Sequence, residues 1–385
     1  MSEWKKVKLG EVCEISAGGD RPQIFSNHRT DKCRIPIYSN GIDNEGLYGF
    51  TDTPKNNGNA ITITGRGANA GTVFYRKDPF LSIIRLLTLT PNSEIINAKY
   101  LFYLLKNKTF LSTGSAQPQI TVPNISQFEI EFNPDIETQH RIASILSRYD
   151  SLIENYQKQI KLLEEAARRL YKEWFIDLRF PGHENTKIVD GLPEGWEKKS
   201  VGEIGTVITG KTPSTSNKEN YGGSIPFITI PDMHTGIYPV SSVFLSEKGA
   251  ESQSKKYIPQ GALIVSCIGT AGLVCITKER CQTNQQINSL ILDDKEMLHY
   301  MYFVFLSLKE HLNNIGSNGA TMTNVNKSKF EGIDIVVPSS CIIRDFSQRT
   351  TPYFENILSL QSQIRLLTEA RDRLLPKLMS GEITV

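Results

Sequence analysis

The stretch KLLEEAARRL (residues 161–170) returns in close form near the C-terminus as RLLTEARDRL (residues 365–374). Each lies in a longer segment whose apolar residues recur every seven positions, with charged residues between them. A heptad pattern sustained over this length is typical of a coiled coil. Because both copies keep one register, we expect the two helices to pair, with these residues in the seam: Ile142, Tyr149, Tyr156, Leu163, Leu170, Phe346, Tyr353, Leu360, Leu367 and Leu374.

A second series of seam residues falls between these positions. Pro352 predicts either a kink in the second helix or the start of its long segment. The alternative is that each helix packs on its own domain, but a heptad seam is narrower than such a stripe needs to be. We place in the second series Ile145, Leu152, Gln159 and Ala166 of the first helix and Thr350, Ile357, Ile364, Arg371 and Leu378 of the second.

The helix is the end of a longer duplication. WKKVKLGEVCEISAG (4–18) matches WEKKSVGEIGTVITG (196–210), and AITITGRGANAGTVFY (60–75) matches ALIVSCIGTAGLVCIT (262–277). NISQFEIEFNP, which begins at Asn124, likewise matches NKSKFEGIDIVVP further on. The order is the same in both halves, so one unit of about 190–200 residues is used twice.

Each copy begins with a strand-rich part and ends in the long helix. Short runs rich in Val, Ile, Thr and Phe, separated by Gly, Pro and Asn, predict strands, and one apolar helix interrupts each set at 98–111 and 298–312. We expect an α+β fold, with two tandem mixed α/β domains separated by two long antiparallel coiled-coil helices in a pseudo-two-fold internal repeat. The expected segments are a first domain (1–136), a central helix (137–180), a linker (181–195), a second domain (196–338) and a C-terminal helix (339–385).

The net charge, the cysteines and the apolar segments bear on the class and compartment of the protein. The 385 residues carry a formal charge of +2, which neither demands nor excludes nucleic acid. The six cysteines form no C-x-x-C pair, so we expect small buried side chains in a reducing compartment. The N-terminus lacks the apolar core of a signal peptide, and the most apolar window (261–277) predicts two buried strands around a turn. We therefore expect a cytoplasmic protein.

Catalytic motifs are missing from the sequence. It contains no G-x-x-x-x-G-K-[ST], G-x-S-x-G or H-E-x-x-H, and its N-P pair, Asn133-Pro134, is followed by Asp135 rather than by the sequence that holds a flipped adenine. The run GRGANAG (65–71) lacks a following helix with a lysine and predicts a β-turn. We expect no catalytic residue, metal ligand or cofactor site in this chain, which leaves a stand-alone enzyme such as a nuclease or glycan-active protein without a supporting motif.

Three segments resemble the specificity subunit of type I restriction–modification systems: LYKEWFIDLRFPG (170–182), LPEGWEKKSVGEI (192–204) and RDRLLPKLMSGEI (371–383). The resemblance implies a non-catalytic subunit in which two target-recognition domains read a bipartite DNA sequence, while the helices set the spacer and dock two methylation subunits. S-adenosylmethionine would then be bound by the methylation subunits and ATP by restriction subunits, with Mg also in the partner subunits. The assembled complex would methylate adenine N6 and cut DNA. The alternative is a stand-alone tandem DNA-binding scaffold or inhibitor.

The helices suit this geometry, because about 35–40 helical residues span roughly 50–60 Å and separate two half-sites by at least one turn of B-DNA. The second copy has TNQQINSLIL (283–292) where the first has LSIIRLLTL (81–89), so the two domains should read different half-sites. Lys and Arg supply phosphate contacts and Asn and Gln pair with adenine. The DNA-binding candidates are Arg21, Lys55, Arg66, Asn69, Arg76, Lys77, Gln117 and Gln119 in the first domain, and Lys211, Lys218, Lys255, Lys256, Asn284, Gln285, Asn318 and Lys327 in the second.

Overall fold

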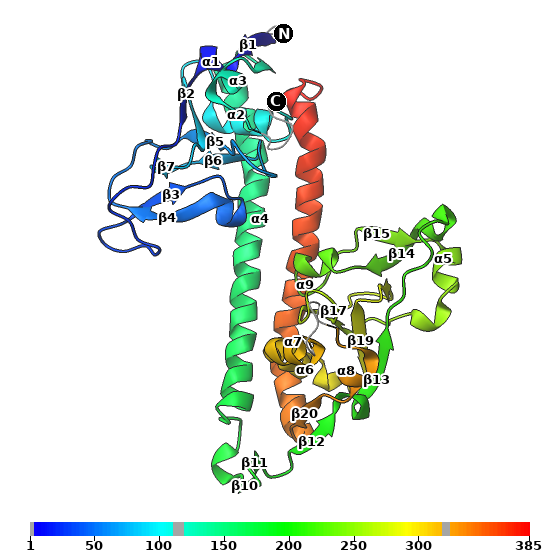
Figure 1. The fold of residues 1–385 in the computed structure, drawn as a ribbon. Coiled ribbons are helices and arrows are strands. Elements are labelled where there is room, and N and C mark those ends of the chain that lie inside the picture. The colour runs from blue at the N-terminus through cyan, green and yellow to red at the C-terminus, as the bar shows by residue number, and fades with distance from the viewer. Residues whose placement is uncertain (1–3, 111–118, 318–323) are drawn as a thin grey trace. The chain divides into compact units, whose positions relative to one another are not determined.

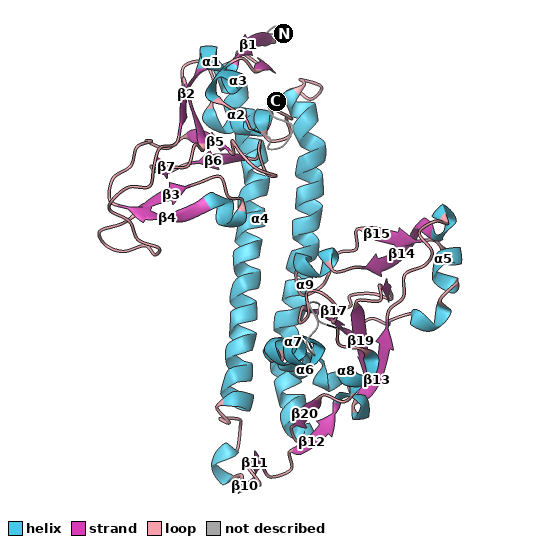
Figure 2. Cartoon of the chain, viewed as in Figure 1, coloured by secondary structure: helices cyan, strands magenta, loops and turns pink. Residues whose placement is uncertain are grey.

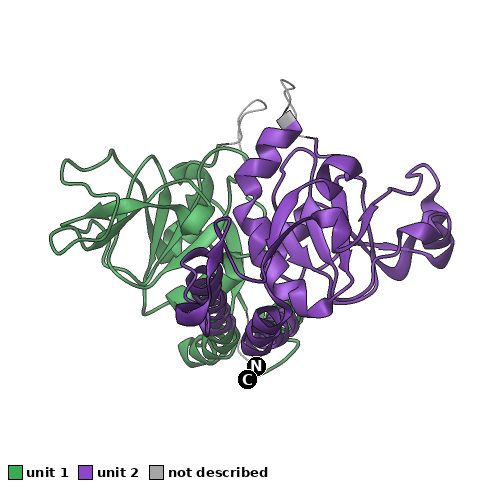
Figure 3. Ribbon diagram, turned by 90° about the horizontal axis from the view of Figure 1, so that it is seen from below, with its two compact units in different colours: residues 1–152, 367–385 green, residues 153–366 purple. Residues whose placement is uncertain are grey.

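The computed structural model describes residues 4–110, 119–317 and 324–385. The chain divides into two compact units, one formed by Met1–Leu152 with Leu367–Val385 and the other by Ile153–Leu366 (Figure 3). Both long helices, α4 (Ile136–Tyr171) and α9 (Ser340–Met379), therefore contribute one part to each unit (Figure 1). Each unit holds the strands of one copy of the repeat together with these helical parts (Figure 2).

The first unit is built on a four-stranded antiparallel sheet in the order β2-β8-β5-β6. A three-stranded sheet, β4-β3-β7, and the pair β1-β9 complete its strands. The Asn97 side chain begins α2 by accepting a hydrogen bond from the backbone of Tyr100, and the apolar face of α2 lies in the core. The bounds are β1 Lys5–Lys8, α1 Leu9–Val12, β2 Cys13–Ala17, β3 Ile35–Tyr38, η1 Asp43–Gly46, β4 Leu47–Thr51, β5 Ala60–Ile63, β6 Val73–Arg76, β7 Leu81–Ser82, β8 Leu87–Pro91, α2 Ala98–Leu105, α3 Val122–Ser126 and β9 Glu129–Phe132.

The second unit repeats this plan and adds one further strand pair, β10-β11. Its sheets have the orders β13-β19-β16-β17, β15-β14-β18 and β12-β20, and β14 runs parallel to β18 as β3 does to β7. The duplication predicted from the sequence is thus confirmed at the level of strand pairing. The bounds are η2 Lys172–Ile176, η3 His183–Asn185, β10 Ile188–Val189, β11 Leu192–Pro193, β12 Glu197–Ser200, η4 Val201–Glu203, β13 Gly205–Thr209, η5 Lys218–Asn220, β14 Tyr221–Ile228, η6 Pro231–Thr235, β15 Val243–Leu245, α5 Glu247–Glu251, η7 Ser254–Lys256, β16 Leu263–Ser266, β17 Val274–Ile276, β18 Gln282–Thr283, β19 Ile287–Leu292, η8 Lys295–Met297, α6 Leu298–Ser307, α7 Lys309–Ser317, α8 Lys327–Glu331 and β20 Asp334–Val337.

One glycine in each unit permits a close crossing of two loops. A Cβ atom on Gly18 would lie 2.7 Å from the backbone nitrogen of Ile83, and one on Gly210 would lie 2.2 Å from the carbonyl oxygen of Asn284. Side chains do not approach backbone atoms so closely, so only glycine fits after β2 and after β13. The crossing brings the start of each following loop onto the loop before β8 or β19.

The two long helices pack against each other inside the first unit. Ile142 and Leu146 of α4 share one apolar core with Leu375 and Leu378 of α9. Asp150 of α4 forms an ion pair with Arg371 of α9, with 2.6 Å between the Oδ1 and Nη1 atoms, and the Tyr103 hydroxyl of α2 donates a second hydrogen bond to Asp150. Both charged side chains are largely buried, with exposed fractions of 23 % and 13 %.

The same pairing occurs in the second unit. Trp174, just after α4, lies against Phe346 of α9 with ring centroids 5.9 Å apart, and nearer the helix centres Leu163 and Leu360 line one small cavity. Residue numbers rise along one helix as they fall along the other, so the helices are antiparallel, as predicted. All ten residues of the first seam series are buried or half-buried.

The second seam series of the first helix was misplaced by one residue. Leu152, Gln159 and Ala166 are exposed, and the residues that follow Ile145 and each of these in sequence are buried or half-buried. The seam therefore alternates steps of four and three residues, as in α9, where the predicted second series is buried or half-buried throughout. The correct residues in the first helix are Leu146, Ile153, Ile160 and Ala167, followed by Trp174.

Two further expectations need correction. Of the two alternatives predicted for Pro352, the start of the long segment is wrong, because α9 begins at Ser340 and continues through it, and the kink stays a prediction. Cys341 is exposed, whereas the other five cysteines are buried and all six are free thiols. Burial raises the pKa of Cys13, Cys267, Cys275 and Cys281 to about 12. No helix in the described ranges is both long and apolar enough to cross a membrane.

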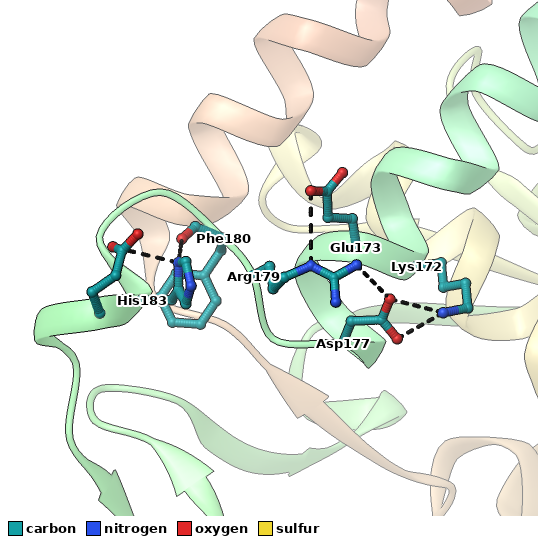
Figure 4. Close-up of polar contacts among 7 residues, drawn as sticks. Lys172, Glu173, Asp177, Arg179, Phe180 and His183 are labelled. Carbon is teal, nitrogen blue, oxygen red and sulfur yellow. Dashed lines mark hydrogen bonds and ion pairs between the residues drawn. The ribbon is translucent and has the colours of Figure 1, made fainter.

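A short ion network ends α4 (Figure 4). Lys172 donates to Asp177 at 2.7 Å, and Arg179 reaches the same carboxylate at 2.9 Å and Glu173 at 3.9 Å. The hydrogen bond from Lys172, helped by both positive charges, lowers the pKa of Asp177. Leu178 between them has a φ of 55°, so the network stabilises a sharp change of direction after the helix.

Candidate nucleic-acid interface

Strand register gathers loops at one edge of each four-stranded sheet. In the first unit Leu87, at the start of β8, pairs with Ala17 at the end of β2 and with Ile63 at the end of β5. The loops that follow β2 and β5 and precede β8 therefore meet there. We call this set, residues 18–19, 64–72, 83–86 and 119–120, the first loop edge.

The second unit has the equivalent arrangement. Asn288, in β19, pairs with Thr209 at the end of β13 and with Val265 near the end of β16. The backbone of Val325 also donates to Cys267 at 2.9 Å, as Ile120 does to Gly65 in the first unit. We call residues 210–212, 267–273, 284–286 and 324–325 the second loop edge.

Three candidates come together on the first loop edge. The backbones of Arg66 and Gln119 form an isolated bridge, and the Arg66 guanidinium donates to the Gln119 amide oxygen at 3.5 Å. Asn69 lies in the turn that begins at Gly67, where Ala70 donates to the Gly67 carbonyl at 3.0 Å. The β-turn expected for this run is confirmed. Arg66 and Asn69 are exposed, so their side chains can reach a ligand from this edge.

Arg76 does not fit the role of a phosphate contact. It is 3 % exposed, donates to Thr62 at 3.0 Å and to Glu45 at 3.1 Å, and its guanidinium lies 3.6 Å from the centre of the Tyr38 ring. Burial is the largest influence on this group and lowers its pKa, against the opposing effects of Tyr38 and Glu45. Arg76 is therefore a structural side chain that joins three strand segments, and it leaves the candidate set.

The other basic candidates of the first unit lie away from the first loop edge. Lys77 follows β6, and Lys55 precedes β5, so both lie at the opposite end of that hairpin from the 64–72 turn. Arg21 stands beyond the edge, with its guanidinium 5.0 Å from the centre of the Phe25 ring. Gln117 lies outside the described residues.

Lys211 and Gln285 come together on the second loop edge. The Lys211 backbone donates to Thr283 at 2.9 Å, and the Thr212 hydroxyl donates to the Gln285 amide oxygen at 2.5 Å. Both candidates are exposed. Asn284 is not available for base reading, because it is 9 % exposed and its amide makes two hydrogen bonds of 3.1 Å to Gln286.

The remaining candidates of the second unit are not among the residues of this edge, although Lys327 lies two residues after Val325. Lys218 begins η5, and Lys255 and Lys256 end η7. Lys327 begins α8 and forms an ion pair with Glu331 one turn later, at 3.4 Å. Asn318 lies outside the described residues.

Sequence reasoning missed two residues of the first loop edge. Ile84 and Arg85 form the tip of the loop before β8, and both are exposed. Counting back from the paired strands, their counterparts in the second unit are Gln285 and Gln286. The aligned runs 81–89 and 283–292 contain these residues, so the signal lay in the difference between the two runs.

The side chains at the two loop edges suit binding to nucleic acid. Among the described residues no three His, Cys, Asp or Glu side chains are grouped so that they could hold a metal ion. Exposed Arg, Lys, Asn and Gln side chains on rigid turns can instead contact phosphates and base edges. The arrangement suits binding of nucleic acid at two separate surfaces.

Comparison with known proteins agrees with this geometry. The profile of the type I restriction modification DNA specificity domain matches residues 1–165 and again residues 193–346, one range for each copy of the repeat. The chain belongs to the type I restriction–modification specificity subunits.

Individual members of the specificity-subunit family resemble this chain along most of its length. The HindI specificity subunit of Haemophilus influenzae is 32 % identical and is covered completely, as is this chain. The MjaIX specificity subunit of Methanocaldococcus jannaschii is 31 % identical over 84 % of this chain and 78 % of its own. The crystal structure of the S subunit from M. genitalium has the same fold, with a TM-score of 0.67 over 98 % of this chain and 96 % of that one at 17 % identity.

Proposed function

We propose that this chain is the DNA-recognition subunit of a type I restriction–modification complex and reads a bipartite target with its two strand-rich domains. The observation that carries the proposal is the repetition of one loop edge in both units with different side chains. Arg66 and Gln119 on the first edge correspond to Ile268 and Asn324 on the second. Two edges of one geometry and unequal chemistry suit two unequal half-sites.

The paired helices would set the spacing and provide a docking surface for two methylation subunits. Support for this comes from the antiparallel contacts in each unit and from membership of the family. S-adenosylmethionine would be bound by the methylation subunits, and ATP and Mg by restriction subunits. This chain would select the adenine that its partners methylate, and would itself perform no chemical step.

The decisive experiment co-expresses the chain with a partner methylation subunit and sequences the methylated adenines of a plasmid. We expect one motif with two defined halves and an undefined spacer. Gln285→Ala should relax the preference at one position of one half only, because a single amide pairs with a single base. Methylation without a bipartite motif, or failure of the two proteins to co-purify, would favour a stand-alone DNA-binding scaffold.

A matched pair of variants tests whether the loop edge is the binding surface. Arg66→Ala should weaken binding to all sequences and reduce the slope of log K against log salt by about one, the value for one phosphate contact. Lys77→Ala removes the same charge at the opposite end of the β5–β6 hairpin and should change neither quantity. Equal effects of the two variants would argue against the loop edge.

A further inference from the structure

The tip of the first loop edge has an unusual backbone. Ile84 has a φ of 52° and Arg85 a φ of 57°, the left-handed region that β-branched residues rarely occupy. The Ile84 side chain is nonetheless 52 % exposed, so it is not drawn into this conformation by core packing. Their counterparts Gln285 and Gln286 do not have positive φ, so the shared fold does not require it.

Several hydrogen bonds hold the tip in place. The backbone of Ile84 donates to Gly19 at 2.8 Å and that of Arg85 to Gly18 at 3.0 Å. The Asn40 amide donates to the Ile84 carbonyl, while its oxygen accepts from Gly65 at 2.7 Å. The loops after β2, β3 and β5 thus all support one exposed isoleucine. These hydrogen bonds hold the strained backbone of Ile84 and Arg85 in one conformation, and strained residues held in this way are a feature of binding sites.

We propose that Ile84 is a specificity-determining residue that contacts the C5-methyl group of a thymine in the first half-site, and that Arg85 contacts the adjacent phosphate. This inference rests on the proposed function. Apolar side chains in the major groove recognise thymine by its methyl group, which no other base of unmodified DNA presents there. A rigid tip is suited to this contact because no ordering is needed on binding. Gln285 would instead read a hydrogen-bonding edge at the equivalent point of the second half-site.

The test measures the affinity of the complex, with its methylation subunits, for synthetic duplexes. These duplexes carry the sequence of the motif identified from the methylated adenines. A half-site that contains an adenine target also contains a thymine opposite it, so each thymine of the first half-site is replaced in turn by deoxyuridine, which lacks only the methyl group. For one of these positions the wild-type complex should bind about fourfold more weakly, the effect of one buried methyl group.

Ile84→Ala should bind the thymine and deoxyuridine duplexes equally, and Ile84→Gly should do the same with an unchanged or higher melting temperature, because glycine adopts this backbone without strain. Ile95→Ala is the matched control, since Ile95 is also an exposed isoleucine but follows β8 at its other end. It should keep the wild-type discrimination.

The inference would be overturned if the wild-type complex bound every deoxyuridine duplex as tightly as the duplex with thymine. An increase in 2-aminopurine fluorescence at the contacted step would also overturn it, because that result indicates a wedge between bases rather than a methyl contact. A complex that shows no bipartite motif at all would instead refute the proposed function. Arg85→Ala should lower affinity for every sequence and leave the deoxyuridine effect unchanged.

Discussion

Replacing Asp150 with asparagine should destabilise the first unit by about 2–3 kcal/mol. The change preserves shape but leaves Arg371, only 13 % exposed, without its charged partner across the helix pair. Burial lowers the pKa of Arg371, but its hydrogen bonds to Asp150 and Asp372 outweigh this and raise it, so the guanidinium stays charged. Hydrogen bonds to charged groups contribute about 1.5–3 kcal/mol each, and breaking a fully buried pair costs about 3–5 kcal/mol. The partial exposure of both groups places this pair toward the lower values.

The free energy of unfolding is measured by urea denaturation with circular dichroism at the helical band. Arg373→Leu is the control, because Arg373 lies in the same helix but is 76 % exposed in its ion pair with Glu369, and its loss should cost at most about 0.5 kcal/mol. Tyr103→Phe, which removes one hydrogen bond to the carboxylate, should cost about 1.5 kcal/mol. A double-mutant cycle between Asp150→Asn and Arg371→Met isolates the pair. A coupling energy below about 0.5 kcal/mol would refute the argument that this pair joins the helices.

The corrected seam predicts that Ile153→Ala lowers the free energy of unfolding by about 2–4 kcal/mol in the same urea assay. Leu152→Ala, at its exposed neighbour, should change it by less than about 0.5 kcal/mol. The reverse order would support the seam first predicted from the sequence. Burial lowers the pKa of His299 from 6.5 to about 4. As the pH falls, the unfolded state therefore binds a proton at a higher pH than the folded state does, and the stability present above pH 6.5 is lost toward pH 4. The stability of the wild type relative to His299→Phe should therefore fall by about 2.5 kcal/mol between pH 7.5 and 4.5, and a pH-independent difference would contradict the burial of a neutral imidazole. Gly67→Ala should lower the free energy of unfolding by about 1 kcal/mol, because Gly67 has a φ of 83°. Gly272→Ala should lower the melting temperature further, because its φ is 90° and the Lys309 Cα would lie 3.1 Å from the new Cβ atom. Equal losses for the two variants would mean that Lys309 moves aside freely.

The fold could be read from the sequence because the duplication repeats its patterns. Alternating strands and glycine turns are local signals, and finding each twice in one order fixed the number of domains. The seam of the first helix was ambiguous at Leu152 and Ile153, which are both apolar, although one heptad later Gln159 is polar and Ile160 is apolar, which favours the series of Ile153. Packing decides between them: Ile153 is 8 % exposed and Leu152 is 42 % exposed.

The candidate interface was harder to predict, since a charged residue type does not reveal burial. Arg76 was included for its charge, but Thr62, Glu45 and Tyr38 supply partners that make its burial favourable. Ile84 was left out because apolar residues are expected in a core and because a positive φ depends on the surrounding loops. Arg66 and Lys211 lie exposed on the two loop edges, because each follows a strand at a glycine turn; their contacts with DNA stay a prediction.

The exposed thiol at the start of α9 offers a practical handle. Cys341 stands outside the core, while the remaining five cysteines are enclosed and four of them resist ionisation at neutral pH. Since maleimides react with accessible thiolates, a single fluorophore should attach to the native chain without mutagenesis. Attached there, the dye would report by energy transfer how far labelled DNA lies from the N-terminal end of α9.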